Sequence, residues 1–139
     1  MPRTIADVMT VAPMTVPPDA TLVDAARVMR EGDVGAVIVL DDAEVRGLVT
    51  DRDLVIRGIA EGRDPSSTQV SEVSSRDLTT VESSGLVEEA VRLMRERNLR
   101  RLPVVEEGKP VGIVSLGDLA VEREPDSALA DISAAAPNR

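Results

Sequence analysis

The sequence predicts a mixed α/β (α+β) fold made of two copies of one β-α-β-β-α unit. The first observation behind this prediction is an internal repeat, in which residues 47–54 (GLVTDRDL) recur 65 positions later as residues 112–119 (GIVSLGDL). At the same offset the two halves align without a gap over about fifty positions. The second observation is that each half has an apolar stretch of helical period, followed by two short apolar runs joined by a polar turn. We therefore expect one supersecondary unit that has been duplicated.

Each element of the first copy follows from local signals. The dipeptide Pro17-Pro18 ends a short strand, and Thr21 with Asp24 has the spacing of a helix-starting capping box. The continuous apolar run at 35–40 is too short for a helix, so we expect a buried strand that forms a hairpin with the next one. The expected elements are a helical turn at 4–9, a strand at 14–16, a helix at 22–32, strands at 35–40 and 45–50, and a helix at 51–60.

The second copy repeats this order after a linker that contains Gly, Pro and Ser. The expected elements are a strand near 79–81, a helix at 85–97, a hairpin spanning 101–115 and a helix from residue 116. We place a first domain at 4–62, the linker at 63–68, a second domain at 69–123 and a C-terminal tail at 124–139. In the tail, the Ala-rich residues 127–136 allow either a short packed helix or a frayed end.

The composition excludes several classes of function. The chain has no Cys and no His, which removes disulfides, thiolate chemistry and the commonest general base and transition-metal ligand. Its net charge of −9 makes it a poor candidate for binding nucleic acid or an anionic membrane. It shows no signal-peptide pattern and no apolar run of transmembrane length, so we expect a cytoplasmic protein. Without His, Cys or a carboxylate cluster of metal-ligand spacing, we expect neither a metal site nor an enzyme.

The repeated motif predicts a site at each strand-to-helix junction. A hydroxyl residue ends each strand (Thr50 and Ser115), and a carboxylate follows in the first helical turn (Asp53 and Asp118). The structural interpretation is that the hydroxyls are N-caps and that the carboxylates favour the helix dipole. The functional interpretation is that the hydroxyl and the helix N–H groups bind phosphate, while the carboxylate accepts from both hydroxyls of a diol. Phosphate with a diol describes a ribonucleotide, whose base would lie on an aliphatic wall from the short first strand.

Both copies resemble CBS domains, and together they resemble a CBS-domain pair, or Bateman module. The resemblance is carried by residues 47–50 with Asp53, residues 112–115 with Asp118, and residues 100–105 (RRLPVV). It covers residues 4–123. The length and layout are similar to those of small stand-alone paired-CBS proteins, including those called hypoxic response proteins.

The resemblance implies that the two CBS units pack as a pseudo-twofold pair with two clefts, in which some family members bind adenosine phosphates. By match to the family motif, Asp118 and Asp53 are the candidates for holding the ribose. The hydroxyls of Ser115 and Thr50 would meet the phosphate. The remaining candidates would border the base or line the pocket wall: Thr80, Val81, Thr15, Val16, Leu102, Pro103, Val37 and Ile38.

The two clefts cannot be equal, because aligned positions differ in charge. Arg100-Arg101 aligns with Gly35-Ala36, and Arg52 aligns with Gly117. We favour the cleft of the second copy, whose arginine pair gives it more cationic charge for phosphate, although Arg52 could supply charge to the other. The alternative for the arginine pair is a solvated strand start that pairs with nearby glutamates.

On this basis the resemblance implies a regulatory module that senses an adenosine-containing ligand in the cleft between its two CBS units. The expected ligand class is AMP, ADP, ATP or S-adenosylmethionine. With no catalytic domain and no required cofactor, the module would act on an unidentified effector protein. Paired-CBS modules commonly dimerise through their helices, so we expect a homodimer. The alternative is a structural or protein-interaction CBS pair that binds no nucleotide.

Overall fold

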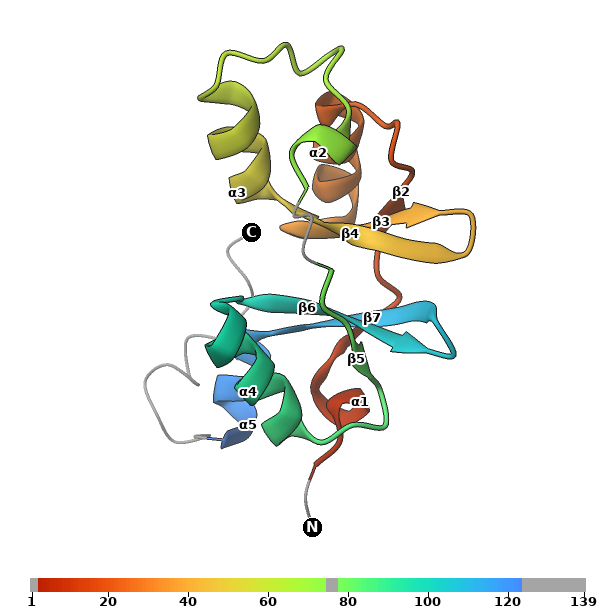
Figure 1. The fold of residues 1–139 in the computed structure, drawn as a ribbon, viewed down its shortest axis with the longest axis vertical. Coiled ribbons are helices and arrows are strands. Elements are labelled where there is room, and N and C mark those ends of the chain that lie inside the picture. The colour runs from red at the N-terminus through yellow and green to blue at the C-terminus, as the bar shows by residue number, and fades with distance from the viewer. Residues whose placement is uncertain (1–2, 75–77, 124–139) are drawn as a thin grey trace. The chain divides into compact units, whose positions relative to one another are not determined.

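The computed structural model describes residues 3–74 and 78–123 of the 139-residue chain (Figure 1). The chain forms two compact units. The middle unit runs from Pro13 to Thr79, and the terminal unit joins the stretch up to Ala12 with the stretch from Thr80 onward. Both units have the order β-α-β-β-α, so the predicted fold class is confirmed. The expected features of residues 127–136 lie outside the described residues.

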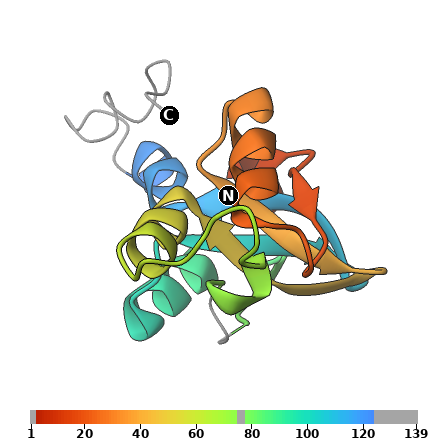
Figure 2. The same ribbon diagram turned by 90° about the horizontal axis from the view of Figure 1, so that it is seen from above.

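The middle unit is a three-stranded sheet with α2 and α3 on one face (Figures 1 and 2). Its strands are β2 (Thr15–Val16), β3 (Ala36–Asp41) and β4 (Glu44–Thr50), and β3 is parallel to β2 and antiparallel to β4. Its helices are α2 (Leu22–Gly32), α3 (Asp51–Asp53), the π-helix η1 (Leu54–Ile59) and the 3-10 helix η2 (Val70–Glu72). In the core, Leu22, Ala25 and Met29 of α2 pack with Val37, Val39 and Val49 of the sheet.

The terminal unit is a four-stranded sheet in the order β1-β7-β6-β5, with α1, α4 and α5 on one face (Figure 1). Its strands are β1 (Thr10–Val11), β5 (Val81–Glu82), β6 (Arg101–Glu106) and β7 (Lys109–Ser115), and β6 is parallel to β5 and antiparallel to β7. Its helices are α1 (Ile5–Val8), α4 (Val87–Arg97) and α5 (Leu116–Arg123). The core contains Ile5, Val81, Ala90, Met94, Leu102, Val104, Val114 and Leu119.

The start of α2 is a capping box at the predicted residues. Thr21 Oγ1 accepts a hydrogen bond from the Asp24 N–H at 3.1 Å, and Asp24 Oδ2 accepts from the Thr21 N–H at 3.0 Å. The bond from the Thr21 backbone is the largest of the influences that lower the pKa of Asp24, because it stabilises the charged carboxylate. The helix ends at Asp33, which takes the left-handed conformation with φ 53°.

Two short helical segments are exchanged between the repeats. Each begins one repeat but packs in the compact unit that is formed mainly by the other repeat. Helix α1 begins the first repeat but packs in the terminal unit, where the Ile5 N–H donates to the Gly85 carbonyl at 2.8 Å. Helix η2 begins the second repeat but packs in the middle unit, where the Val70 N–H donates to the Ala20 carbonyl at 2.8 Å. Ile5 and Val70 are both fully buried. The repeats along the sequence and the compact units in space are therefore not the same sets of residues.

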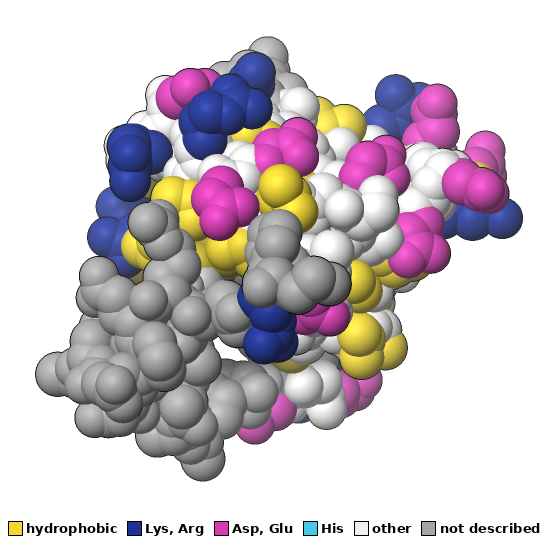
Figure 3. Space-filling model, turned by 90° about the horizontal axis from the view of Figure 1, so that it is seen from below, with side chains coloured by type: hydrophobic (Ala, Val, Ile, Leu, Met, Phe, Trp, Pro, Cys, Tyr) yellow, Lys and Arg dark blue, Asp and Glu magenta, His cyan; other side chains and the backbone are white. Residues whose placement is uncertain are grey.

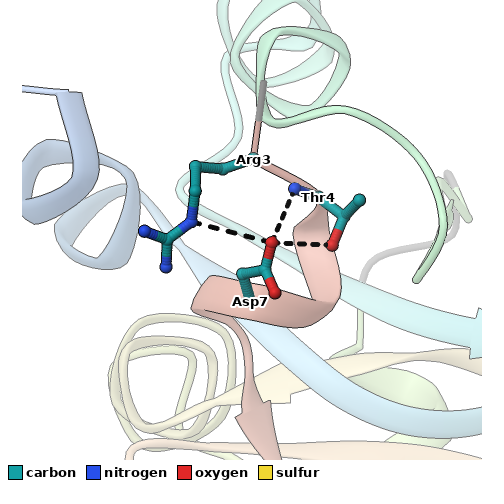
Figure 4. Close-up of polar contacts among 3 residues, drawn as sticks. All are labelled: Arg3, Thr4 and Asp7. Carbon is teal, nitrogen blue, oxygen red and sulfur yellow. Dashed lines mark hydrogen bonds and ion pairs between the residues drawn. The ribbon is translucent and has the colours of Figure 1, made fainter. Parts of the chain in front are cut away.

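A network at Thr4 fixes the start of α1 (Figure 4). Asp7 Oδ2 accepts from the Thr4 backbone N–H and from the Thr4 hydroxyl, both at 3.0 Å, and lies 3.6 Å from Arg3 Nε. The bond from the Thr4 backbone is the largest influence that lowers the pKa of Asp7, and the charge of Arg3 adds a smaller one. Because a helix of one turn is not stable alone, this capped start and the burial of Ile5 hold it in place.

Besides the placement of α1 and η2, two features of the fold were not predicted from the sequence. Strand β1 pairs with β7, and a Cβ at Gly112 would lie 2.7 Å from the Thr10 carbonyl oxygen, so this close approach requires glycine. The predicted helix at 51–60 continues beyond α3 as a π-helix, in which the Ala60 N–H donates to the Val55 carbonyl at 2.8 Å.

The surface of the described chain carries both signs of charge. Figure 3 shows acidic and basic side chains interspersed with hydrophobic ones on the described part of one face, which is typical of a solvated surface. Among the residues that the structure describes, no helix has the length and apolar character needed to span a membrane.

Candidate functional site

The junction between β7 and α5 is a complete capping box. Ser115 Oγ accepts from the Asp118 N–H at 3.1 Å, and Asp118 Oδ2 accepts from the Ser115 N–H at 2.9 Å. The junction between β4 and α3 has the same two bonds at the same distances, made by Thr50 and Asp53. All four side chains are half-buried. The structural interpretation of the repeated motif is therefore confirmed, because these residues cap their helices.

The capping bonds do not use all the hydrogen-bonding positions of the junction side chains. An ionised carboxylate has about four lone-pair positions, and the capping bond uses one of them on Oδ2. The hydroxyls of Ser115 and Thr50 also retain a donor, because each accepts one bond in its cap. The cap holds each carboxylate in a fixed orientation, so it would present the remaining acceptor positions to a diol without further ordering.

The predicted arginine pair lies beside the Ser115 junction. Arg101 is directly opposite Ser115 in the antiparallel β6–β7 pairing, and the Leu116 N–H donates to the Arg100 carbonyl at 2.8 Å. Arg100 is exposed and Arg101 is partly exposed. The structure thus brings a hydroxyl, a carboxylate and two guanidinium-bearing residues together at one junction of the terminal unit.

The matching junction of the middle unit has the same backbone but different side chains. Ala36 is opposite Thr50 in the β3–β4 pairing, and the Asp51 N–H donates to the Gly35 carbonyl at 3.0 Å. The Arg52 N–H donates to Asp51 Oδ1 at 2.8 Å. A backbone amide at the start of this helix is therefore already hydrogen-bonded to a side-chain carboxylate. Sequence reasoning missed Asp51, although its alignment with Leu116 is visible at the offset of the repeat.

The predicted wall residues divide between the two faces of their strands. Val81 and Leu102 belong to the hydrophobic core of the terminal unit, and Val16 and Val37 belong to that of the middle unit. Their strand neighbours Pro103 and Ile38 point to the opposite faces of the sheets, because side chains alternate along a strand. The side chains of these four core residues therefore pack inside their own units, whereas those of Pro103 and Ile38 lie on the other face of each sheet. Thr15 is exposed and pairs with Ile38, and Thr80 directly precedes β5.

The two junctions also differ in charge. At the aligned positions, the terminal unit has one carboxylate and two arginines: Asp118, Arg100 and Arg101. The middle unit has two carboxylates and one arginine: Asp51, Asp53 and Arg52. An anionic ligand is therefore favoured at the terminal junction by the local charges.

Comparisons with known proteins match both halves of the chain. The model of the CBS domain matches twice, over residues 5–58 and 70–123. The CBS domain-containing protein YhcV of Bacillus subtilis is 41% identical over 133 residues, which cover 93% of this chain and 94% of that protein. A crystal structure of Hypoxic Response Protein I with two coordinated zinc ions is 36% identical, with a TM-score of 0.75, and the match covers 86% of this chain and 98% of that one.

A further solved structure is the CBS-domain pair of protein MJ0100 in complex with 5′-methylthioadenosine and S-adenosyl-L-methionine. It is 20% identical with a TM-score of 0.76, and the match covers 86% of this chain and 94% of that one. At this identity the likeness concerns the fold. The resemblance of the sequence to paired-CBS proteins, including a hypoxic response protein, is thus confirmed.

Zinc, which the hypoxic response protein coordinates, does not fit the side chains available here. Protein zinc sites are built mainly from Cys thiolates and His imidazoles, and this chain has neither residue at any position. Carboxylates would have to supply the ligands, and within residues 3–74 and 78–123 no group of three or more is placed to hold an ion.

Proposed function

This chain belongs to the CBS-domain family, and from that membership we propose that it is a regulatory module that binds an adenosine-containing ligand at its strand-to-helix junctions. The observation that carries the proposal is the grouping of Ser115, Asp118 and the Arg100-Arg101 pair in the terminal unit. A carboxylate held by its capping bond suits the two hydroxyls of a ribose, and a hydroxyl with guanidinium groups suits a phosphate.

The ligand class follows from the same side chains. The two arginines favour AMP, ADP or ATP, because guanidinium groups pair with phosphate oxygens through charge-assisted hydrogen bonds. S-adenosylmethionine is the other candidate, and it is supported by the MJ0100 pair, whose fold holds that ligand and 5′-methylthioadenosine. Both classes share the adenosine group, so the ribose carboxylate has the same role in each.

The module would act on a partner protein and would itself be a homodimer. The chain matches CBS domains over both halves, and we assign it no catalytic activity of its own. Three apolar side chains are exposed along η1 in the middle unit: Val55 at 55%, Ile56 at 47% and Ile59 at 55%. A helix surface of this kind is what a second copy would bury, so sedimentation at micromolar concentration should show a dimer. A monomer at that concentration would contradict this part of the proposal.

A second candidate function is a structural or protein-interaction pair without nucleotide. It is favoured by the capping boxes, since Ser115 with Asp118 and Thr50 with Asp53 satisfy each other without any ligand. In that case the repeated motif would have been retained for helix capping alone, and no adenosine compound would bind.

A thermal-shift panel separates the two functions. The ligands are adenosine, AMP, ADP, ATP, S-adenosylmethionine and NAD, with GTP as the matched control that changes only the base. At a concentration of one hundred times Kd, a ligand stabilises the protein by about 2.7 kcal/mol. Because the chain has no Trp or Tyr, a strong 260 nm band in purified protein would indicate bound nucleotide. No shift with any adenosine compound, and no such band, would favour the structural module.

A further inference from the structure

We propose that Asp51 is a specificity-determining residue that excludes phosphate from the Thr50–Asp53 junction, so that the two junctions accept different adenosine ligands. A phosphorylated nucleotide binds at the Ser115–Asp118 junction. An adenosine compound without phosphate, uncharged or cationic, binds at the Thr50–Asp53 junction. This inference rests on the proposed function and adds which ligand each junction selects.

The first argument is that backbone amides of α3 already have acceptors within the protein. The Asp51 N–H donates to the Gly35 carbonyl at 3.0 Å, and the Asp53 N–H donates to Thr50 Oγ1 at 3.1 Å. Between them, the Arg52 N–H donates to Asp51 Oδ1 at 2.8 Å. A phosphate oxygen that approached this amide would have to displace a carboxylate and then lie beside its negative charge.

The second argument is that the terminal unit keeps the flanking bonds and lacks the carboxylate. The Leu116 N–H donates to the Arg100 carbonyl at 2.8 Å, and the Asp118 N–H donates to Ser115 Oγ at 3.1 Å. The position of Asp51 is taken here by Leu116, whose side chain is 45% exposed and has no hydrogen-bond acceptor. The side chain that competes with phosphate in one junction is therefore replaced by an apolar one in the other.

The third argument is the charge around each junction. Arg52 supplies one positive charge beside Asp51, but Asp53 adds a second carboxylate to the same turn. At the other junction two arginines accompany a single carboxylate. Two like charges about 4 Å apart repel by enough to weaken binding about fivefold in bulk water, and more at the lower effective dielectric near a protein surface. The difference in charge therefore affects the affinity for phosphate. The carboxylate that would bind ribose is present in both junctions.

An ordinary structural role for Asp51 makes a different prediction. A carboxylate in the first helical turn interacts favourably with the helix dipole, so its removal would lower stability whatever its effect on ligands. That role changes the affinity for AMP and for adenosine by the same factor. Electrostatic exclusion changes the affinity for AMP alone, so the ratio of the two dissociation constants distinguishes the roles.

The experiment is calorimetric titration of full-length protein with adenosine and with AMP. Asp51→Leu is made in an Asp118→Asn background, which weakens the terminal junction, and Asp51→Asn is the control that keeps an acceptor but removes the charge. We expect Asp51→Leu to strengthen AMP about tenfold, Asp51→Asn to do so partly, and adenosine to change less than about twofold. The reciprocal change Leu116→Asp, in the otherwise unaltered protein, should weaken AMP about tenfold and spare adenosine.

Two outcomes would overturn the inference, and they are distinguishable. In the first outcome, the unaltered protein binds adenosine compounds, but neither Asp51→Leu nor Leu116→Asp changes the ratio of AMP to adenosine affinity relative to its own parent protein. Asp51 then does not select the ligand, and the proposed function stands. If the unaltered protein binds neither adenosine, AMP nor S-adenosylmethionine, the proposed function fails and this inference fails with it.

Discussion

Replacing Asp118 and Asp53 by alanine, one at a time, separates the capping role of these residues from ligand binding. The two carboxylates have equal structural roles, because each accepts its capping bond at 2.9 Å and its own N–H donates at 3.1 Å. Loss of such a cap costs about 1 kcal/mol, so both variants should remain folded with similar decreases in melting temperature. Each variant is therefore the stability control for the other.

Ligand binding should not be equal in the two variants. A carboxylate that accepts from both ribose hydroxyls contributes roughly 1.5–3 kcal/mol, so Asp118→Ala should weaken AMP by about ten- to a hundredfold. Asp53→Ala should have a smaller effect, because the local charges disfavour AMP at its junction. In the same titrations Arg101→Ala should weaken ATP at least as much as adenosine, since it removes a phosphate contact and leaves the base alone.

Calorimetric titration of the three variants would refute this reasoning in either of two ways. If Asp53→Ala abolishes AMP binding while Asp118→Ala has no effect, the assignment of AMP to the terminal junction is wrong. If neither substitution changes affinity although AMP binds, the carboxylates are helix caps and nothing more. A large difference between the two variants in melting temperature without ligand would show that the capping roles are not equal, which would invalidate the control.

Four further predictions concern stability. Val104→Asp buries an unpaired charge at a fully buried position and should cost several kcal/mol, which an unchanged melting temperature would contradict. Gly58→Ala places a Cβ 2.6 Å from Leu22 Cδ1, and urea unfolding should show a loss of about 1–3 kcal/mol, whereas a gain would mean that helix propensity outweighs the clash. The folded-state pKa of Asp24 lies below its usual 3.8, chiefly through its bond from the Thr21 backbone, so this carboxylate stabilises the fold above pH 3.8 and the contribution is lost as pH falls through the lowered pKa. Urea midpoints measured between pH 6 and pH 2 should therefore fall less steeply in Asp24→Asn, and identical slopes would contradict the coupling. Treatment with EDTA should leave the melting temperature unchanged, because the chain has no Cys or His for a zinc site, and a clear decrease would show that metal is bound.

The helices and hairpins could be predicted because their signals are local. Thr21 and Asp24 form the capping box that their spacing indicated, and the apolar runs of both hairpins are strands of the two sheets. The same holds for the junction residues, whose positions relative to the strand end followed from the repeat. In each case the determining interaction joins residues that are close in the sequence.

The placement of α1 and η2 could not be predicted, for a physical reason. Ile5 and Val8 are spaced for one face of a helical turn, as are Val70 and Val73, so the sequence indicates that each segment packs against something. It does not indicate which unit, because the two repeats offer similar apolar surfaces to similar segments. The faces of the wall residues were uncertain for a related reason: whether Leu102 points into the core depends on register, which is set by pairing across the sheet.

Duplication would allow one module to recognise two kinds of ligand, as proposed, without loss of stability. Both capping boxes are intact, so each helix start is held by its own hydroxyl and carboxylate and does not depend on a bound ligand. The neighbouring positions 35–36 and 51–52 in one copy, and 100–101 and 116–117 in the other, are free of that constraint and have diverged in charge. Substitutions there alter the electrostatic potential around the junction but remove no capping bond. Exchanging these four positions between the copies should exchange the preference for AMP while changing the melting temperature little, and a large loss of stability in the exchanged protein would refute this explanation.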